Sequence, residues 1–280
     1  MKAKKSLGQN FLVDKSAVGR IVDAVSPAAD EVILEVGPGK GALTRLLIER
    51  AGLVLAVELD RELVDLLKTE LVSDKLKIVE ADILQVDIEE LRRSALESNP
   101  KLQPRLRVVA NLPYYISTAV ITRFIESRSA IKDLTLMLQR EVAERITSPP
   151  GGREYGSLSV LVQLYCRTRR LFHVPPGSFR PIPKVDSTVV QLEIDDSSSA
   201  LVKDEGLLVR VVRAAFAQRR KTIMNSLKGA SASIDPQLTP EKIAQTLESA
   251  SIVPERRAET LSPAEYIRLG DQFSLVLEQR

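Results

Sequence analysis

The alternation of apolar and polar positions predicts strands and helices that follow one another over the first two thirds of the chain. Short apolar runs, the expected strands, cover residues 32–36, 53–58, 76–80, 106–110 and 134–138. Stretches with apolar residues at helical spacing lie between them, at residues 41–50, 61–71, 88–96 and 116–126. Such an alternation is typical of a parallel sheet with helices on both faces.

Two further apolar runs, at residues 169–174 and 188–194, read as closing strands. A last antiparallel strand is common in such a sheet. The polar run Asp195-Asp196-Ser197-Ser198-Ser199 then reads as a linker, and only helical patterns follow it. We therefore predict an α/β domain over residues 1–199 and a small all-helical domain over residues 200–280.

Composition narrows the class of protein. Hydrophobic residues make up 44% of the 280 residues and charged residues 28%, as in ordinary globular proteins. A single cysteine, Cys166, allows no internal disulfide, and with a single histidine, His173, a zinc site of the usual kind is not expected. The apolar runs are too short to span a bilayer, and the basic N-terminus has no apolar stretch behind it. We expect a cytoplasmic monomer without metal.

The first expected strand leads into a glycine-rich turn, Gly37-Pro38-Gly39-Lys40-Gly41-Ala42. Glycines allow a sharp turn and a close approach of the backbone to a ligand. Glu58 ends the second strand, where a carboxylate can accept hydrogen bonds from ribose hydroxyls. Both features are typical of a site for a nucleoside-containing ligand, but they do not distinguish NAD from S-adenosylmethionine.

Two further strand ends carry polar side chains. Asp82 follows the third strand, where it could accept from an adenine amino group, and the fourth strand ends in Asn111-Leu112-Pro113-Tyr114. The Asn111 oxygen and a backbone carbonyl beside Pro113 could accept the two hydrogens of an exocyclic amine, and Tyr114 could lie on its ring. The same tetrapeptide also occurs as a simple turn. Because ligands of open α/β sheets sit outside the carboxyl ends of the strands, this joint placement favours S-adenosylmethionine over NAD.

Several stretches in this order resemble the ribosomal RNA adenine dimethyltransferases of the small subunit. The resemblance covers most of the chain and rests on residues 7–12, 35–39, 58, 81–82, 111–115, 139–143, 155–156 and 179–187. It implies a Rossmann-like class I S-adenosylmethionine-dependent methyltransferase sheet with a C-terminal helical domain. It also implies dimethylation of N6 on two adjacent adenosines in the 3′-terminal hairpin loop of small-subunit rRNA, within a 30S subunit or its precursor, with S-adenosylhomocysteine as product.

The resemblance also implies roles for individual residues. The expected cofactor contacts are Asn10, Leu12, Gly37, Gly39, Glu58, Asp82 and Asn111. Asn111 and Pro113 are expected to hold the target amine, and Tyr114 and Phe179 to sandwich the adenine. For Phe179 a place in the core is the alternative, although Pro181 and Pro183 favour an extended surface segment.

A basic helical stretch is the expected RNA contact. Residues 206–228 carry an apolar stripe at helical spacing and, on another face, the cations Arg210, Arg213, Arg220 and Lys221. A solvated charged face is the common alternative, but this face is nearly free of acids. Together with Lys184, these side chains predict phosphate contacts that weaken as salt rises.

Three rival functions stay open on the sequence. The first is a methyltransferase acting on large-subunit rRNA, the second is a non-catalytic nucleic-acid-binding factor with the same fold, and the third is an NAD or small-molecule enzyme. The stretch Phe179-Arg180-Pro181-Ile182-Pro183-Lys184 and the C-terminal tail favour the small-subunit enzyme over the first rival. The intact glycine turn and the polar strand ends argue against the second.

Overall fold

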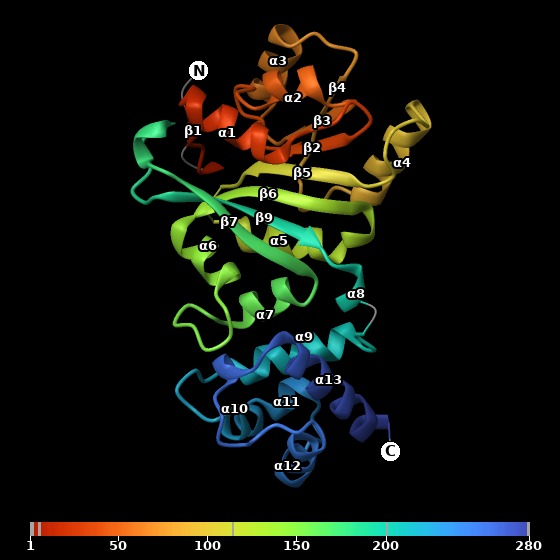
Figure 1. The fold of residues 1–280 in the computed structure, drawn as a ribbon, viewed down its shortest axis with the longest axis vertical. Helices are drawn as coiled ribbons and strands as arrows, with labels where there is room; N and C mark the ends of the chain where they lie inside the picture. The colour runs from red at the N-terminus through yellow and green to blue at the C-terminus, as the bar shows by residue number, and fades with distance from the viewer. Residues whose placement is uncertain (1–2, 5–6, 114, 200, 279–280) are drawn as a thin grey trace. The chain divides into compact units, whose positions relative to one another are not determined.

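A seven-stranded sheet organises the first part of the chain in the computed structural model, which describes residues 3–4, 7–113, 115–199 and 201–278 (Figure 1). Its strands are β2 (Val32–Val36), β3 (Leu53–Glu58), β4 (Leu76–Glu80), β5 (Leu106–Asn111), β6 (Ile131–Gln139), β7 (Cys166–Val174) and β9 (Ser187–Ile194), in the order β4-β3-β2-β5-β6-β9-β7. Strands β2 to β6 are parallel, and β9 is antiparallel to β6. The predicted α/β class and its antiparallel closing strand are confirmed.

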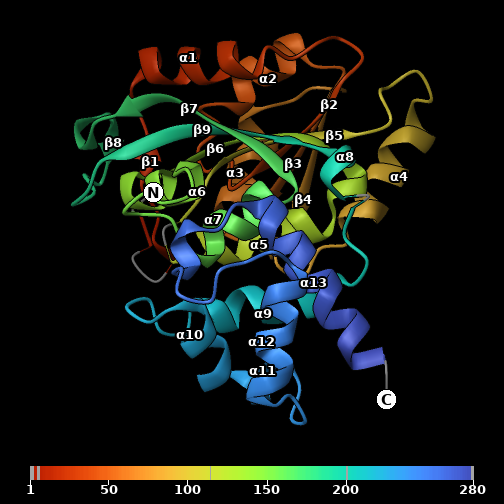
Figure 2. The ribbon, with the colours of Figure 1, turned by 60° about the horizontal axis from the view of Figure 1, so that its bottom comes forward.

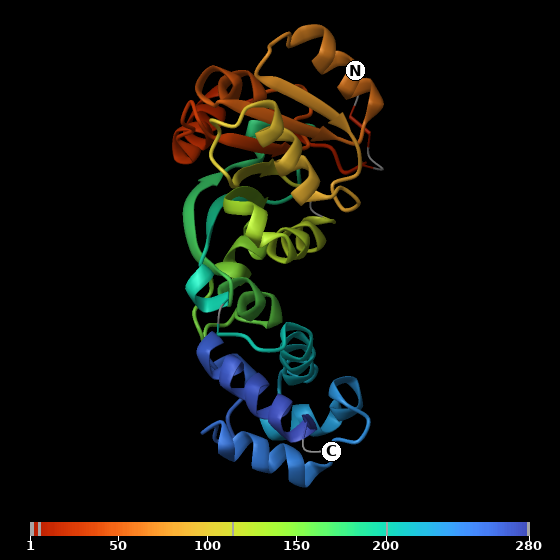
Figure 3. The same ribbon diagram turned by 90° about the vertical axis from the view of Figure 1, so that its right-hand side faces the viewer.

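Helices cover both faces of this sheet, with α1 and α2 on one side and α4 and α5 on the other (Figures 2 and 3). Helix α3 lies beside α2, where Arg45 pairs with Glu70. Their bounds are α1 (Lys15–Val25), α2 (Thr44–Arg50), α3 (Arg61–Glu70), α4 (Ile88–Ser98) and α5 (Ser117–Glu126). Asp14, Asp60 and Asp87 each precede a helix and accept hydrogen bonds from its first amides. Helix α2 begins at Thr44 and not at Gly41 as predicted, because Gly41 has a φ of 75° that no right-handed helix contains.

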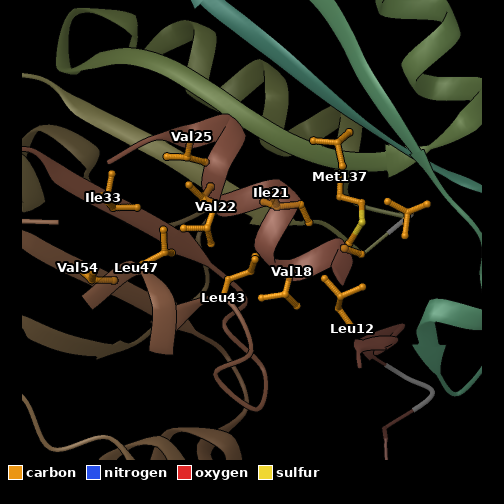
Figure 4. Packing of buried hydrophobic residues seen from close by; sticks show 14 of the residues in the cluster. Leu12, Val18, Ile21, Val22, Val25, Ile33, Leu43, Leu47, Val54 and Met137 are labelled. Carbon is orange, nitrogen blue, oxygen red and sulfur yellow. The ribbon is translucent and has the colours of Figure 1, made fainter. Parts of the chain in front are cut away.

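An apolar cluster fixes the sheet against α1 and α2 (Figure 4). Ile33, Val54 and Val109 on three neighbouring strands face Val22 and Leu47 of the two helices, and all five are fully buried. Side chains alternate between the faces of a strand, so Leu34, Leu55 and Val108 belong to the opposite face. Strand β2 is therefore held from both sides, and the turn that follows it starts from a rigid position.

A second, two-stranded sheet pairs β1 (Phe11–Leu12) with β8 (Phe179–Arg180) in antiparallel register. The Val13 amide donates to the Ser178 carbonyl at 2.9 Å, and the Ser178 hydroxyl donates to Asp14 at 2.9 Å. These contacts tie the N-terminal segment, which sequence alone allows to be a free tail, to the chain just before β9.

Contacts divide the chain into two compact units. The sheet unit comprises Met1–Ala143 and Thr168–Ile194, and the helical unit comprises Glu144–Arg167 and Asp195–Arg280. Residues 144–167 thus pack with the C-terminal helices, whereas the sequence boundary assigned them to the α/β domain. The division of function between residues 1–199 and 200–280 stays a prediction.

The helical unit encloses three aromatic side chains. The Phe216 ring lies 6.3 Å from Tyr155 and 6.1 Å from Tyr266, between ring centroids, and the two tyrosine hydroxyls donate to the carbonyls of Leu261 and Ala258. The helices of this part of the chain are α6 (Arg140–Thr147), α7 (Ser157–Gln163), α8 (Asp196–Ser199), α9 (Glu205–Ala215), α10 (Ile223–Gly229), α11 (Ser231–Ile234), α12 (Pro240–Ser249) and α13 (Pro263–Glu278). Single 3-10 turns lie at Arg128–Ala130, Pro176–Ser178 and Ala258–Thr260.

The expected linker lies at the boundary between the two units, after Ile194, although it contains the one-turn helix α8. The prediction of a single helix over residues 206–228 is wrong, because this stretch is broken. Helix α9 ends at Ala215, the chain turns through Gln218, whose carbonyl accepts from the Lys221 amide and the Ser226 hydroxyl, and α10 begins after Thr222. The aromatic contacts of Phe216 and the helix-capping hydroxyl of Thr222 favour this break over a continuous helix.

Among the described residues, no helix is both long and apolar enough to cross a membrane. In the same part of the chain, no three or more histidine, cysteine, aspartate or glutamate side chains gather where they could hold a metal ion.

Candidate functional site

The glycine-rich turn after β2 adopts the backbone conformation that its sequence predicts. Gly37, Gly39 and Gly41 have φ values of 65°, 59° and 75°, which residues with side chains rarely adopt. A Cβ at Gly37 would have open space within 4 Å, whereas one at Gly39 would lie 3.1 Å from the Phe11 ring. The turn therefore leaves room for a ligand above Gly37 and is covered by the N-terminal segment at Gly39.

Glu58, at the end of β3, holds this turn in place. One carboxylate oxygen accepts from the Gly39 amide at 3.1 Å, and the other accepts from the amides of Leu59 and Asp60 at 2.9 Å each. Burial raises the pKa of Glu58, and these three amides partly oppose that shift. The predicted ribose-binding residue is thus also a structural clamp. Oε1 already accepts from two amides, whereas Oε2 accepts from one and retains a lone pair for a ligand hydroxyl.

A cleft opens at the carboxyl ends of the parallel strands. It encloses about 1090 Å³, including the part open to solvent. Its walls contain the predicted cofactor residues Asn10, Leu12, Gly37, Gly39, Glu58, Asp82 and Asn111, together with Pro113. The sheet order β4-β3-β2-β5 explains this convergence, because the four strands that carry these residues or lead into them are neighbours.

Asn111 is oriented by the N-terminal segment. Its side-chain amide donates to the Asn10 carbonyl at 3.1 Å, and the Leu112 amide donates to the Met137 carbonyl at 3.3 Å. Because the Nδ2 group is turned toward Asn10, the opposite side of the side-chain amide presents the oxygen. Asp82 is held in a similar way, since its Oδ1 accepts from the Leu84 amide at 2.9 Å.

The contacts that close the N-terminal segment over the cleft were not predicted from the sequence. Lys4 Nζ and Gln9 Nε2 donate to the two oxygens of Asp60, at 2.7 and 2.9 Å, and Lys4 also pairs with Glu62. Burial raises the pKa of Asp60, but the hydrogen bonds from Lys4 and Gln9 outweigh burial and hold this pKa below its usual value. The only sequence signal was a carboxylate two positions after Glu58. Lys4 is thus engaged with Asp60 and Glu62.

Glu35 is another residue whose role the sequence did not indicate. It lies in the wall of the cleft with 1% of its surface exposed, and no described residue donates a hydrogen bond to its Oε2. Burial raises the pKa of Glu35 to about 7; the dipoles of Thr44 lower it in part, and the charge of Glu58 adds to the rise. Its position two residues before Gly37, inside an apolar strand, was the available signal.

The charges of the cleft distinguish between the two candidate cofactors. Among the described residues that line it, Glu35, Glu58 and Asp82 are acidic and only Lys40 is basic. Lys40 is exposed and lies 5.0 Å from the centre of the Phe11 ring. The carboxylates of Glu58 and Asp82 would repel the pyrophosphate of NAD and would attract a sulfonium cation. The residues present therefore fit S-adenosylmethionine better than a dinucleotide.

Two predicted base-binding residues are not placed in the cleft. Tyr114 lies outside the described residues. Phe179 has 1% of its surface exposed, belongs to the apolar cluster and is not part of the cleft wall. Pro181, Ile182 and Lys184 after it are exposed, so the expected surface segment begins just beyond the aromatic ring. The stacking role of Phe179 stays a prediction, and it requires that its ring become uncovered.

The predicted RNA contacts lie on exposed surfaces. Arg210 and Arg213 are exposed on α9, and Arg220 and Lys221 are exposed in the turn before α10. The neighbouring Arg219 instead donates to the carbonyls of Arg153 and Tyr155 and pairs with Glu259. The cations therefore come from a helix and a turn and not from one helical face, and their contact with RNA stays a prediction.

The parallel sheet, the glycine turn and the acidic strand ends define a class I methyltransferase. Two solved structures share this fold over 95% of the chain. A dimethyladenosine transferase from Plasmodium falciparum matches with a TM-score of 0.79 over 98% of its own chain, and the 23S rRNA methyltransferase ErmE with 0.66 over 100% of its own chain. Both are 24% identical to this chain.

The family model "Ribosomal RNA adenine dimethylase" matches residues 1–273, and the chain belongs to this family of rRNA adenine dimethyltransferases. Family membership implies rRNA as substrate and S-adenosylmethionine as methyl donor. A relative named "Ribosomal RNA small subunit methyltransferase A" from Clostridium botulinum (strain Langeland) is 42% identical over 96% of this chain and 94% of its own. Another of the same name, from Alkaliphilus metalliredigens, is 39% identical over 96% of this chain and 91% of its own.

Proposed function

We propose that this enzyme dimethylates N6 of two adjacent adenosines in the 3′-terminal hairpin loop of small-subunit rRNA, acting on a 30S subunit or its precursor. One observation carries the proposal: Asn111 and Pro113 share a cleft with the glycine turn, Glu58 and Asp82. An amine acceptor and a nucleoside-sulfonium site therefore lie side by side. The names of the curated relatives support the small subunit as substrate.

Residues at the ends of the strands bind the cofactor. Glu58 accepts hydrogen bonds from the ribose hydroxyls, Asp82 accepts from the adenine amino group, and the space above Gly37 admits the chain that bears the sulfonium. When bound, S-adenosylmethionine supplies an electrophilic methyl group and yields S-adenosylhomocysteine. Residues 7–12 cover the site and exclude water.

Asn111 and the backbone beside Pro113 activate the target nitrogen. The Asn111 oxygen and a backbone carbonyl accept the two amine hydrogens, which draws the nitrogen lone pair out of conjugation with the ring. Nitrogen then forms a bond to the methyl carbon as the carbon–sulfur bond breaks, and its surplus proton passes to water. No strong base is required, and alignment of the two reactants supplies on the order of 7–11 kcal/mol of the barrier reduction.

A loop adenosine suits this cleft, because extruding a base from a duplex costs a few kcal/mol and an unpaired base avoids most of that cost. Arg210, Arg213, Arg220, Lys221 and Lys184 are the proposed phosphate contacts, which position the RNA without reading its sequence. We place the enzyme in the cytoplasm as a monomer that needs no metal.

Mapping the methyl label tests this function. Unmethylated small subunits and, separately, large subunits are incubated with the protein and labelled S-adenosylmethionine, and the labelled nucleotides are identified. We expect two adjacent dimethyladenosines in the small-subunit hairpin and no label on large subunits. Label on the large subunit would show the activity named for ErmE, whose fold the chain shares. No transfer to either subunit, together with nucleic-acid binding, would indicate a non-catalytic factor.

A further inference from the structure

Glu35 has a position that none of the roles described above explains. It is the third of the three carboxylates that line the cleft, and it is the most deeply buried of them. Glu58 accepts from three backbone amides and Asp82 from one, whereas Oε2 of Glu35 has no hydrogen-bond partner in the part of the chain that the structure describes. A buried charge without a partner costs several kcal/mol, so the group either carries a proton or receives a cation.

Among the described residues, the surroundings of Glu35 offer no internal cation. Its neighbours in register on β3 and β5 are Ala56 and Val109, and Thr44 of α2 contributes a hydroxyl that also has no hydrogen-bond partner among residues with a described position. The charged groups around the cleft are Glu58, Asp82 and the exposed Lys40, and the facing residues of α1 in the apolar cluster are uncharged. The charge that acts on Glu35 is thus the negative charge of Glu58, which opposes ionisation.

We propose that Glu35 holds a proton in the ligand-free cleft and loses it when the methyl donor binds, and that its charge lets the enzyme distinguish the cationic donor from the neutral product. The inference rests on the proposed donor site. The donor carries a sulfonium that the product lacks, so only the donor brings a compensating charge to an ionised Glu35. Methyl transfer removes that charge, and Glu35 regains a proton as the product leaves.

The sign of the pH dependence follows from this exchange. Because donor binding releases a proton, donor affinity should rise with pH through the range around 7, where Glu35 in the free protein titrates. Product affinity should change less over the same range. The ratio of the product and donor dissociation constants therefore increases with pH.

Calorimetric titration tests the exchange without a methylation assay. Donor and product are each titrated into the full-length protein at pH 7, in buffers of different ionisation enthalpy, and the dependence of the binding enthalpy on the buffer gives the number of protons released. With a pKa of about 7, we expect about half a proton released per donor bound, and clearly fewer per product. The amine of the donor itself contributes equally to wild type and variants, so the difference between proteins is the measured quantity.

Glu35→Gln keeps the shape of the side chain and cannot ionise. We expect this variant to release fewer protons on donor binding than the wild type and to lose about tenfold of the preference for donor over product. Its Tm should equal or exceed that of the wild type, since a buried ionisable group is removed. Glu49→Gln, an exposed position on α2, is the matched control and should retain both properties. A purely structural role for Glu35 would lower the Tm and leave the proton release of the remaining folded protein unchanged.

Equal proton release by wild type and Glu35→Gln would overturn the inference, as would an unchanged ratio of donor and product affinities. Both results leave the proposed function intact, because the donor still binds. Absence of any donor binding to the wild type would instead contradict the proposed function itself.

Discussion

Asn111 combines two tasks through the two ends of one side chain. The amide nitrogen donates a hydrogen bond to the Asn10 carbonyl at 3.1 Å, which fixes the rotation of the amide group and leaves its oxygen available to an amine. An aspartate could not make the same donor contact, since an ionised carboxylate only accepts. The residue type at this position is therefore set by a contact with a segment one hundred residues earlier in the chain.

Asn111→Ala should separate chemistry from binding. Loss of the amine acceptor should lower the methylation rate by about 100-fold or more, comparable to removal of one oriented polar group in other enzymes. Donor affinity should fall by less than about tenfold, because the glycine turn, Glu58 and Asp82 are untouched. Single-turnover methylation and calorimetric titration measure the two quantities. An unchanged methylation rate would refute the role of Asn111 in holding the amine.

The ring of Phe179 is buried in the apolar cluster, so a test of its stacking role must separate stacking from core packing. Phe179→Ala would remove core volume and destabilise the fold by about 3–5 kcal/mol, which would obscure a catalytic effect. Phe179→Leu keeps most of the apolar volume but removes the aromatic face. If the ring stacks on the target base, the methylation rate of this variant should fall at least tenfold while donor affinity and Tm change little. Parallel losses in rate, donor affinity and Tm would assign Phe179 to the core alone.

At the scale of elements, the start of α13 shows how a helix end can anchor the helical unit. The Ser262 amide and hydroxyl donate to Glu265, the Glu265 amide donates back to Ser262, and Arg256 forms an ion pair with Glu265. These contacts form a capping box, and the sequence Ser262-Pro263-Ala264-Glu265 has the residue pattern of that motif. The hydrogen bond from Arg256 is the main reason that the pKa of Glu265 falls to about 2.

Glu265→Gln should therefore make the protein less sensitive to acid. A carboxylate whose pKa is lower in the folded state stabilises the fold above its unfolded pKa of 4.5, and this contribution is lost as pH falls from 4.5 toward 2. We expect the variant to lose about 1–3 kcal/mol of unfolding free energy at pH 7 and to differ much less from the wild type near pH 2. Urea unfolding at pH 7, 4 and 2.5 measures this difference. A constant difference at all three values would contradict the assignment.

The elements that sequence patterns predicted best are those governed by their own residues. Strands β2, β3 and β4 match their predicted bounds, because each is a short, mainly apolar run that a helical pattern follows. The helix expected over residues 206–228 failed, because its break depends on the packing of Phe216 against two tyrosines from distant parts of the chain. Local periodicity carries no information about such a contact.

At the scale of the whole molecule, the net charge of +3 is too small to explain binding to a polyanion. The exposed cations Arg210, Arg213, Arg220 and Lys221 concentrate charge on one stretch of chain, and Lys184 adds to the proposed contacts from the sheet unit. Contacts of this kind release counterions from the phosphates they neutralise, which makes affinity depend on salt.

Replacing Arg210, Arg213, Arg220 and Lys221 by glutamine should weaken binding to small subunits and flatten its dependence on salt. We expect the slope of log affinity against log salt to fall by about 1 for each phosphate that the variant no longer neutralises, with donor affinity unchanged. Arg61, Lys68, Arg93 and Lys101, all exposed elsewhere in the sheet unit, give a control variant with the same change of charge. Equal slopes for the two variants would show that these four cations neutralise no specific phosphates.

The sequence by itself determined the order of the elements, the glycine turn, the residues at the strand ends and the family, because each depends on a short run of residues. Only the tertiary structure decided what those residues do to one another. It showed that Glu58 clamps the glycine turn, that Lys4 and Gln9 fasten the N-terminal segment to Asp60, and that Phe179 is buried. It also left Oε2 of Glu35 without a hydrogen-bond partner among the described residues, since burial, unlike periodicity, depends on every segment that packs around a residue.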